Sequence, residues 1–211
     1  MKIYVVAATM EEIEPLLEEG TNEYKLLVTG LGMVPTTYHL TKVFKEDRPG
    51  LAIQAGIAGS FETNLPLGTT VTVKQDRFAD LGVQEQGQWR DLFDMGLTEK
   101  NEPPFTDGWL INKSEILDRS RLASVNSITI NEINTNRAHI GEIRQKYAPV
   151  IESMEGAAFH YVCLKEEIPF IQLRSVSNYV GERNKSNWQI KKAVENLNKE
   201  LFNLIRQFAN E

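Results

Sequence analysis

Short apolar runs that alternate with amphipathic stretches are the feature that most constrains the fold of this chain. Residues 3–8 form a continuous apolar run rich in β-branched side chains, as a strand buried on both faces requires. Residues 187–208 instead place apolar side chains at helical spacing. Alternation of the two patterns along the chain predicts an α/β fold, in which helices cover a central mixed sheet on both sides.

The alternation continues throughout residues 1–211, so we expect one domain. A first helix begins either in the capping box Thr9-Met10-Glu11-Glu12 or near Glu14. Residues 84–107 contain several Gly and Pro residues between recognisable core segments, and we expect a long loop or lid there. We expect glycine turns at residues 30–32 and 56–60, strands at 3–8, 24–29, 51–55, 69–73, 122–130, 150–153 and 169–176, and further helices at 35–44, 132–147, 155–167 and 187–208.

Composition excludes several classes of function. The net charge is -6 and the isoelectric point is about 5.3, which argues against a nucleic-acid surface because such a surface needs a basic stripe. Cys163 is the single cysteine, so no internal disulfide can form, and its helical apolar surroundings favour a buried thiol. No stretch approaches the roughly 20 apolar residues of a membrane helix, and the N-terminal run is unlike a signal peptide. We expect a cytoplasmic protein with no membrane partner.

Polar residues that follow predicted strands are the candidates for a site, since ligands bind beyond the carboxyl ends of strands in α/β sheets. These candidates are Glu12, the 56–60 turn, the pair Met154-Glu155, and Arg174 with Ser177 and Asn178. Each has a structural alternative. Glu12 completes a capping box, Glu155 opens a helix whose dipole favours a carboxylate, and Asn178 can cap a loop. Arg174 lies inside an apolar strand and needs a partner, which Glu12 or Glu155 could supply.

Familiar cofactor and catalytic motifs are missing from the sequence. It contains neither GxGxxG nor GxxxxGK[ST], so dinucleotide and nucleoside triphosphate sites lack support. The three histidines, His39, His139 and His160, are dispersed. This dispersal argues against a metal site and against a Ser-His-Asp triad.

Four segments together resemble the nucleoside phosphorylase/nucleosidase superfamily over nearly the whole chain. They are "MKIYVVAATMEEIEPLL", "AGIAGSF", "ESMEGAAFHYVC" and "IPFIQLRSVSN". Within that superfamily, "RFADLGV", "WRDLFDMGL" and "RSVSNYVGERNKSNW" are similar to segments of the futalosine hydrolases, enzymes of menaquinone biosynthesis. Methylthioadenosine/S-adenosylhomocysteine nucleosidases carry Asp where Asn178 stands, and often Ser where Ile57 stands.

The resemblance implies a single three-layer α/β/α domain, a homo-oligomer, a purine nucleoside substrate and no metal or organic cofactor. It also implies roles for individual residues. Glu12 matches the residue that activates water, and Asn178 occupies the position that handles the purine leaving group. The remaining matches are substrate contacts and their support: Gly59, Met154, Glu155, Arg174 and Ser177.

Three alternatives to futalosine hydrolysis stay open at this point. One is methylthioadenosine/S-adenosylhomocysteine nucleosidase activity, and another is non-catalytic nucleoside binding. The third is phosphorolysis, which needs cations over a phosphate, yet residues 7–20 and 51–73 contain no Arg or Lys. We further expect Arg183, Lys185 or Trp188 to contact the substituent at the ribose 5′ end, because cations and an aromatic ring follow Asn178 closely.

Overall fold

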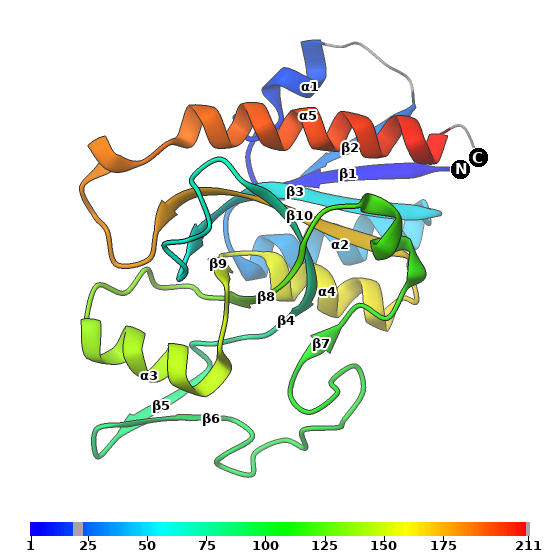
Figure 1. Ribbon diagram of the computed structural model, residues 1–211. Helices are drawn as coiled ribbons and strands as arrows, with labels where there is room; N and C mark the ends of the chain where they lie inside the picture. Colours follow the sequence, from blue (N-terminus) through cyan, green and yellow to red (C-terminus); the bar gives the residue numbers. More distant parts are fainter. Residues whose placement is uncertain (19–22, 210–211) are drawn as a thin grey trace.

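The apolar runs form the strands of one mixed sheet, which helices cover on both faces (Figure 1). The structure is a computed structural model that describes residues 1–18 and 23–209. Its helices are α1 (Glu14–Glu18), α2 (Met33–Glu46), α3 (Arg137–Tyr147), α4 (Gly156–Lys165) and α5 (Ile190–Ala209), with short 3-10 helices at Glu115–Ser120 and Lys185–Asn187. Its strands are β1 (Ile3–Ala7), β2 (Tyr24–Val28), β3 (Leu51–Ser60), β4 (Thr70–Asp76), β5 (Gly82–Glu85), β6 (Gln88–Asp91), β7 (Leu110–Ile111), β8 (Ser124–Thr129), β9 (Ile151–Ser153) and β10 (Phe170–Tyr179).

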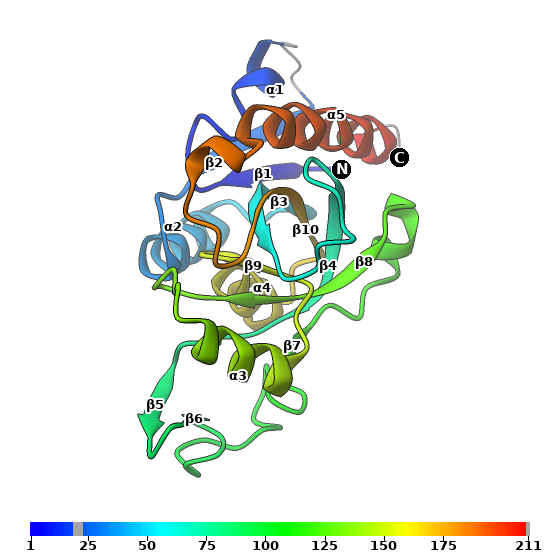
Figure 2. The same cartoon turned by 60° about the vertical axis from the view of Figure 1, so that its left-hand side comes forward.

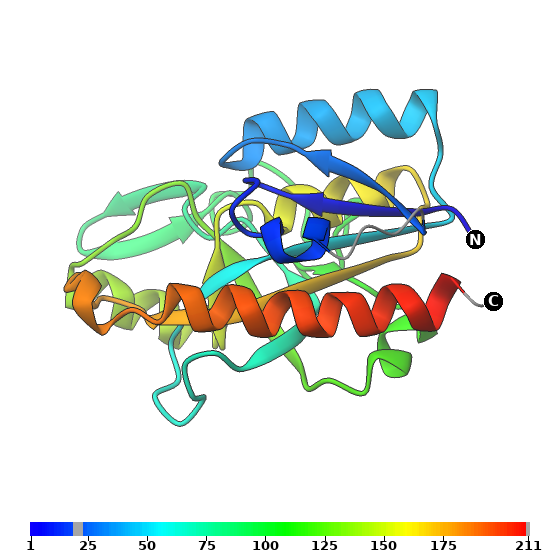
Figure 3. The same ribbon diagram turned by 90° about the horizontal axis from the view of Figure 1, so that it is seen from above.

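Alternate side chains of the central strands supply two cores, which is why these runs are apolar throughout. On one face, Val5 packs with the apolar side of α5, represented by Leu201 and Phe208. On the other face, Val6 packs with α2 and α4, through residues such as Phe159. Figure 3 shows α5 running along the length of its layer. The predicted three-layer α/β/α fold is confirmed.

The sheet closes on itself at one end. Strand β3 pairs in parallel with β1 and β10, and its carboxyl end also pairs antiparallel with β9. Strands β10, β4, β8 and β9 continue the pairing, so five strands including β3 form a ring that can be followed in Figure 2. The carboxyl end of β3 is therefore enclosed by a strand on each side.

Two predicted boundaries at the sheet were wrong, and both affect the site. The segment 56–60 is not a turn, because β3 continues to Ser60. Likewise, β10 does not end at Val176 but extends to Tyr179. Pairing with neighbouring strands overrides the turn preference of glycine and the loop preference of Ser and Asn. The turn predicted at residues 30–32 does form, with Gly30 and Gly32 both at φ 87°.

The segment 84–107 was predicted as an irregular loop, and this is wrong for its first part. Strands β5 and β6 form an antiparallel hairpin, with Gln86 and Gly87 at positive φ between them. Residues 92–107 contain no helix or strand. Whether this segment acts as a lid stays a prediction.

A helix can start at a different residue from the one that the sequence pattern predicts when a capping side chain fixes its first turn. Helix α3 begins at Arg137 and not at residue 132, because the Asn136 side chain accepts from the backbone N–H groups of Ala138 and His139. Helix α1 begins at Glu14, which was the second of the two predicted starts. Of the helices in the described ranges, none combines the length and hydropathy that a membrane span requires.

Candidate active site

A cavity of about 250 Å³ lies at the carboxyl ends of β1, β3, β9 and β10. This is the edge of an α/β sheet at which ligands bind. Six of the seven residues predicted for a site line it: Glu12, Gly59, Met154, Glu155, Ser177 and Asn178. The seventh, Arg174, is not part of the lining.

Glu12 is held in place by backbone donors from two segments of the chain. Its Oε2 accepts from the N–H groups of Ala8 at 3.2 Å and Thr9 at 3.3 Å, which follow β1. Its Oε1 accepts from the N–H of Ile57 in β3 at 3.0 Å. The contact with Thr9 matches the capping geometry expected from sequence, although α1 starts two residues after Glu12. One carboxylate thus joins two strand ends and faces the cavity.

Burial raises the pKa of Glu12 above its ordinary value. The positive charge of Arg174 and the Ile57 N–H oppose this rise, whereas the nearby carboxylate of Glu155 adds to it. A carboxylate with a raised pKa is a stronger base toward water than an ordinary one. Glu12 therefore combines the position and the basicity that a general base needs.

Arg174 lies beneath the cavity, where it supports Glu12. Its Nη2 donates to Gln54 Oε1 at 2.8 Å, so the hydrogen-bond partner is an amide and not the carboxylate that sequence predicted. A Cβ on Gly56 would lie 1.9 Å from Arg174 Nη1 and 2.9 Å from Glu12 Oε1. Gly56 is therefore required for the guanidinium and the carboxylate to approach each other across β3.

Glu155 connects the cavity to the predicted glycine turn. Its side chain is 5% exposed, and its Oε1 accepts from the N–H of Gly32 at 2.9 Å. Glu155 also stands at the N-terminus of α4, where the helix dipole stabilises a negative charge. These contacts orient a carboxylate beside Met154, in a position suited to accept hydrogen bonds from sugar hydroxyls.

An irregularity in β10 gives Ser177 and Asn178 their positions. Val176 pairs with Ala58 and Asn178 with Gly59, so Ser177 is an extra residue in the ladder. Ser177 Oγ lies 3.2 Å from Ala58 O and 2.8 Å from Asn178 Oδ1. The bulge thereby brings the Asn178 amide to the cavity and sets a hydroxyl against its oxygen.

Several lining residues had not been identified from sequence. Ile130 and Ile133 are apolar residues beside a strand and carry no distinctive sequence signal, whereas Ile57 and Ala58 belong to the 56–60 segment, which was a candidate as a whole. Glu152 lies two residues before Met154, in the segment from which only Met154 and Glu155 were predicted as site residues. Trp188, predicted to meet the substrate, does line the cavity. The remaining residues missed are Ala8, Thr9, Leu31, Ser153, Gly181 and Glu182.

The two cations predicted to meet the substrate with Trp188 lie outside the lining. Arg183 places its guanidinium 5.6 Å from the centre of the Trp188 ring, a cation–π distance. Lys185 begins the short 3-10 helix before Trp188. Both residues are thus near the rim, and Trp188 is the one that reaches the cavity.

The charge of the cavity is negative. Among the described residues that line it there are four Glu side chains and no Lys, Arg or His. The described part of the chain also contains no group of three or more His, Cys, Asp or Glu placed to hold a metal ion. Carboxylates, an oriented amide and apolar walls suit a polyhydroxylated ligand with an aromatic base.

Comparison with known proteins gives one family and two named activities. The phosphorylase superfamily matches residues 17–210. A futalosine hydrolase from Thermus thermophilus is 27% identical, over 85% of this chain and 79% of the relative. A 5'-methylthioadenosine/S-adenosylhomocysteine nucleosidase from Haemophilus ducreyi is 28% identical, over 84% of this chain and 85% of the relative. The structure of a nucleosidase with the same name from Colwellia psychrerythraea superposes with a TM-score of 0.83 at 18% identity, covering 98% of this chain and 95% of that one.

Proposed function

The chain belongs to the phosphorylase superfamily, and we propose that it hydrolyses the N-glycosidic bond of futalosine. The products are hypoxanthine and dehypoxanthine futalosine, and the reaction belongs to menaquinone biosynthesis. Relatives named as hydrolases and nucleosidases support cleavage of a nucleoside by water. The choice of futalosine needs an observation from the cavity itself.

The orientation of the Asn178 amide is the observation that carries the proposal. Ser177 Oγ lies against Asn178 Oδ1, and Asn178 Nδ2 donates to Tyr179 O at 3.2 Å. One hydrogen of the NH2 group is thereby used for a local backbone carbonyl, as the structural alternative expected. The second hydrogen is free for a ligand, and Nδ2 lies only 3.3 Å from where a Cβ on Gly59 would stand.

An amide so placed suits hypoxanthine better than adenine. Hypoxanthine presents O6, an acceptor, beside N7, which gains a proton as the base leaves. The Asn178 NH2 donates to O6 while its oxygen accepts from N7–H. Adenine presents an amino donor in place of O6, which would face the amide NH2. The hydrolysis of methylthioadenosine or S-adenosylhomocysteine, the activity named for other relatives, is therefore the second candidate.

The reaction divides into three tasks that the described geometry can perform. Glu12 takes a proton from a water on the face of the sugar opposite the base, as its raised pKa and fixed carboxylate allow. Glu155 and Met154 hold the ribose for in-line attack. Asn178 stabilises the charge that develops on the purine as the sugar carbon becomes oxocarbenium-like, in analogy with other glycosyl transfers.

Water is favoured over phosphate as the nucleophile by the charge of the cavity. Phosphorolysis needs cations to hold the anion, and the described lining supplies none. The buried Arg174 lies behind Gly56, where it is bonded to Gln54. Its charge acts on Glu12 and leaves no guanidinium in the lining for a phosphate.

We also propose that the protein is a cytoplasmic homo-oligomer. The start of α2 and the turn before it expose large apolar side chains, with Leu31 67%, Val34 79% and Tyr38 60% exposed. Leu31 also lines the cavity. A second copy on this surface would bury these side chains and close one side of the cavity. Light scattering during gel filtration tests this, and a monomer at micromolar concentration would contradict it.

Mass spectrometry of futalosine incubated with the pure protein tests the proposed reaction. We expect hypoxanthine and dehypoxanthine futalosine to appear together, at the same rate with and without phosphate. A ribose 1-phosphate product that requires phosphate would indicate phosphorolysis. Release of adenine from methylthioadenosine, with futalosine left intact, would select the second candidate. Binding without any product would indicate a non-catalytic protein.

The same assay tests recognition at the 5′ end of the ribose. Futalosine carries an aromatic carboxylate there, which Trp188 can stack on and Arg183 or Lys185 can pair with. Alanine at any of these residues should raise KM for futalosine more than KM for inosine. Equal changes in both KM values for all three variants would remove these residues from substrate recognition.

A further inference from the structure

We infer that Glu152 reads the N1 edge of the purine, accepting a hydrogen bond from N1–H of a 6-oxopurine. Glu152 would then be a specificity-determining residue that acts beside Asn178. The inference rests on the proposed function for the placement of the base against Asn178. Three properties of Glu152 support the inference: its register in the sheet, its lack of protein partners and the cavities that it lines.

The register of the sheet places Glu152 and Asn178 on either side of one glycine. Gly59 pairs with Glu152 of β9 on one side and with Asn178 of β10 on the other. Side chains of directly paired residues project from the same face of a sheet. Because Gly59 has no side chain, the side chains of Glu152, Asn178 and Val180 can approach one another over it. A Cβ there would lie 3.3 Å from Asn178 Nδ2 and 3.4 Å from Glu152 Cγ.

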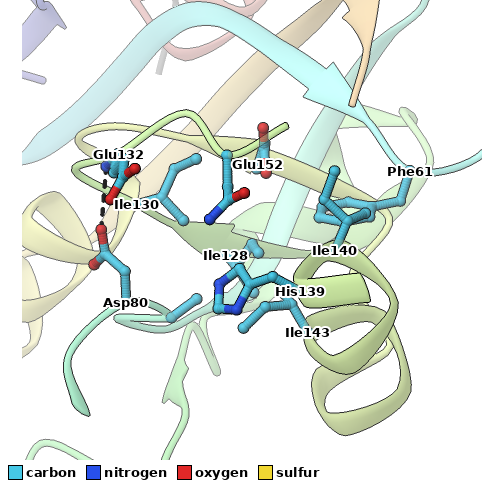
Figure 4. Close-up of a pocket in the computed structure, with 11 residues that line it drawn as sticks. Phe61, Asp80, Ile128, Ile130, Glu132, His139, Ile140, Ile143 and Glu152 are labelled. Atoms are coloured by element: carbon cyan, nitrogen blue, oxygen red, sulfur yellow. Dashed lines mark hydrogen bonds between the residues drawn. The ribbon is translucent and has the colours of Figure 1, made fainter. Parts of the chain in front are cut away.

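Glu152 has no compensation for its burial within the described structure. Its carboxylate makes no hydrogen bond or ion pair there, and burial is the one cause of the change in its pKa. It lines the main cavity and also a smaller one of about 50 Å³, whose other walls include Ile130 and Phe61 (Figure 4). Glu152 is partly buried, and a carboxylate without protein donors beside a cavity is available to a donor on the ligand.

The purine supplies such a donor at the required place. Around the six-membered ring, N1 follows directly after C6, which carries O6. Once the Asn178 amide bonds N7 and O6, N1 is therefore the next polar atom along the same edge. It lies far from the glycosidic nitrogen, as Glu152 lies far from Glu12. Three residue steps along β3 lead from Gly56, beside Glu12, to Gly59, beside Glu152, a span of about 10 Å at strand rise.

The protonation state of Glu152 decides which purine it suits. Hypoxanthine has N1–H, which needs an acceptor, whereas adenine has a bare N1, which needs a donor. An ionised Glu152 can only accept, and a protonated one can donate to adenine N1. Burial raises the pKa of Glu152 to about 7, so both states are accessible near neutral pH.

Other charged groups around Glu152 are acidic, with one exception. From the smaller cavity it is faced by Asp80, Glu132 and His139, which lie on three different segments. From the main cavity it shares the lining with Glu12, Glu155 and Glu182. A donor at purine N1 would favour the ionised form, so hypoxanthine and Glu152 ionisation should stabilise each other.

Titration calorimetry with free hypoxanthine and free adenine at pH 6 and pH 8 tests the inference without depending on catalysis. The proteins are the wild type, Glu152→Gln and the control Glu132→Gln, which changes a Glu that lines the smaller cavity alone. For the wild type, we expect the ratio of hypoxanthine affinity to adenine affinity to rise at least about 5-fold from pH 6 to pH 8. In Glu152→Gln, whose amide can both donate and accept, the ratio should be smaller and insensitive to pH. Glu132→Gln should match the wild type.

An affinity ratio in Glu152→Gln equal to that of the wild type at both pH values would overturn the inference. Failure of the wild type to bind either base would overturn both the inference and the proposed function. One further outcome separates the inference from the proposed function. If the ratio responds as expected while futalosine is left intact, the proposed reaction fails and the role of Glu152 in reading the base stands.

Discussion

Two carboxylates on the same sheet, Asp76 of β4 and Glu152 of β9, have opposite surroundings. Asp76 accepts from the Thr129 hydroxyl at 2.9 Å, the Arg77 N–H at 2.8 Å and the Gln172 amide at 3.2 Å. Glu152 accepts from none of the described residues and faces two cavities. Burial raises the pKa of Asp76 to about 6 and that of Glu152 to about 7.

The difference shows that burial of a carboxylate does not by itself indicate function. Asp76 is fully buried, yet its side-chain donors come from β8 and β10, so this carboxylate of β4 joins three strands. Thr129 continues the network by accepting from the N–H of Ala157 in α4 at 2.7 Å. Asp76 therefore stabilises the fold, whereas Glu152 costs stability in the free protein and can recover it from a ligand.

Glu12 has hydrogen-bond donors, like Asp76, and faces the cavity, like Glu152. Its substitution should have the largest effect on catalysis. Backbone donors hold its carboxylate, as donors hold that of Asp76, yet it faces the cavity. Glu12→Gln keeps the shape but cannot take a proton from water. We expect kcat for futalosine hydrolysis to fall at least about 10²-fold with the fold retained, although thermal stability should fall because the Gln NH2 group meets one of the backbone N–H donors. For the wild type, kcat should fall as pH drops through the raised pKa of Glu12.

The control for this prediction is Glu11→Gln, which changes an exposed neighbour outside the cavity and should leave kcat unchanged. A Glu12→Gln variant with near-normal kcat would reduce Glu12 to a capping residue. The base would then have to be another carboxylate of the cavity.

Asn178→Asp should have the next largest effect, because it places a second carboxylate across Gly59 from Glu152. A carboxylate at residue 178 would face the O6 lone pairs of hypoxanthine, and a mismatched buried pair costs about 1–3 kcal/mol. The preference for futalosine over the analogue that carries adenine should narrow about 5- to 150-fold. The measurement is kcat/KM for both substrates. An unchanged ratio would mean that Asn178 does not read the base.

The sequence predicted much of this site because strand ends can be recognised from apolar runs. The positions of Glu12, Glu155 and Asn178 at the carboxyl edge follow from the strands that precede them. The pairing of Gly59 with both Glu152 and Asn178 could not be predicted, because it depends on which strands become neighbours in space. The bulge at Ser177 depends in the same way on a partner strand.

The Asp76 network shows the same limit for the fold. Asp76, Thr129 and Gln172 lie in three separate strands and had no motif in common, so sequence gave no reason to connect them. For the same reason, Gln54 could not be identified as the partner of Arg174. A carboxylate was expected there because charge suggested it, and local sequence held no information against that choice.

Asp76→Asn should test the structural half of the comparison. The amide presents an NH2 group to at least one of the donors that now face a carboxylate, and an unmatched buried donor costs about 1–3 kcal/mol, or more for a charged group. Burial raises the pKa of Asp76 to about 6, so its charge costs stability at pH 8, and Asn avoids that cost while losing an acceptor. We expect the free energy of unfolding to fall in urea titrations at pH 8, by less than the roughly 3 kcal/mol that an unmatched donor alone can cost. KM for futalosine should stay close to the wild-type value in the fraction that folds. Wild-type stability in this variant would contradict the assignment of Asp76 to the fold.

Glu152→Gln should have the smallest effect of these substitutions. It should raise the stability of the folded protein, whereas Asp76→Asn should lower it. The pKa of Glu152 is about 7 in the folded protein, above its ordinary 4.5, so the folded state binds the proton more tightly than the unfolded chain. Stability from this group is therefore present below about pH 4.5 and is lost as pH rises to about 7. Gln carries no charge at any pH and avoids this loss. The variant should unfold like the wild type at pH 5 and be more stable by about 1–2 kcal/mol at pH 8. Thermal unfolding at both pH values measures this, with Glu132→Gln as the control. A variant less stable than the wild type at pH 8 would mean that Glu152, like Asp76, is a structural carboxylate with a donor of its own.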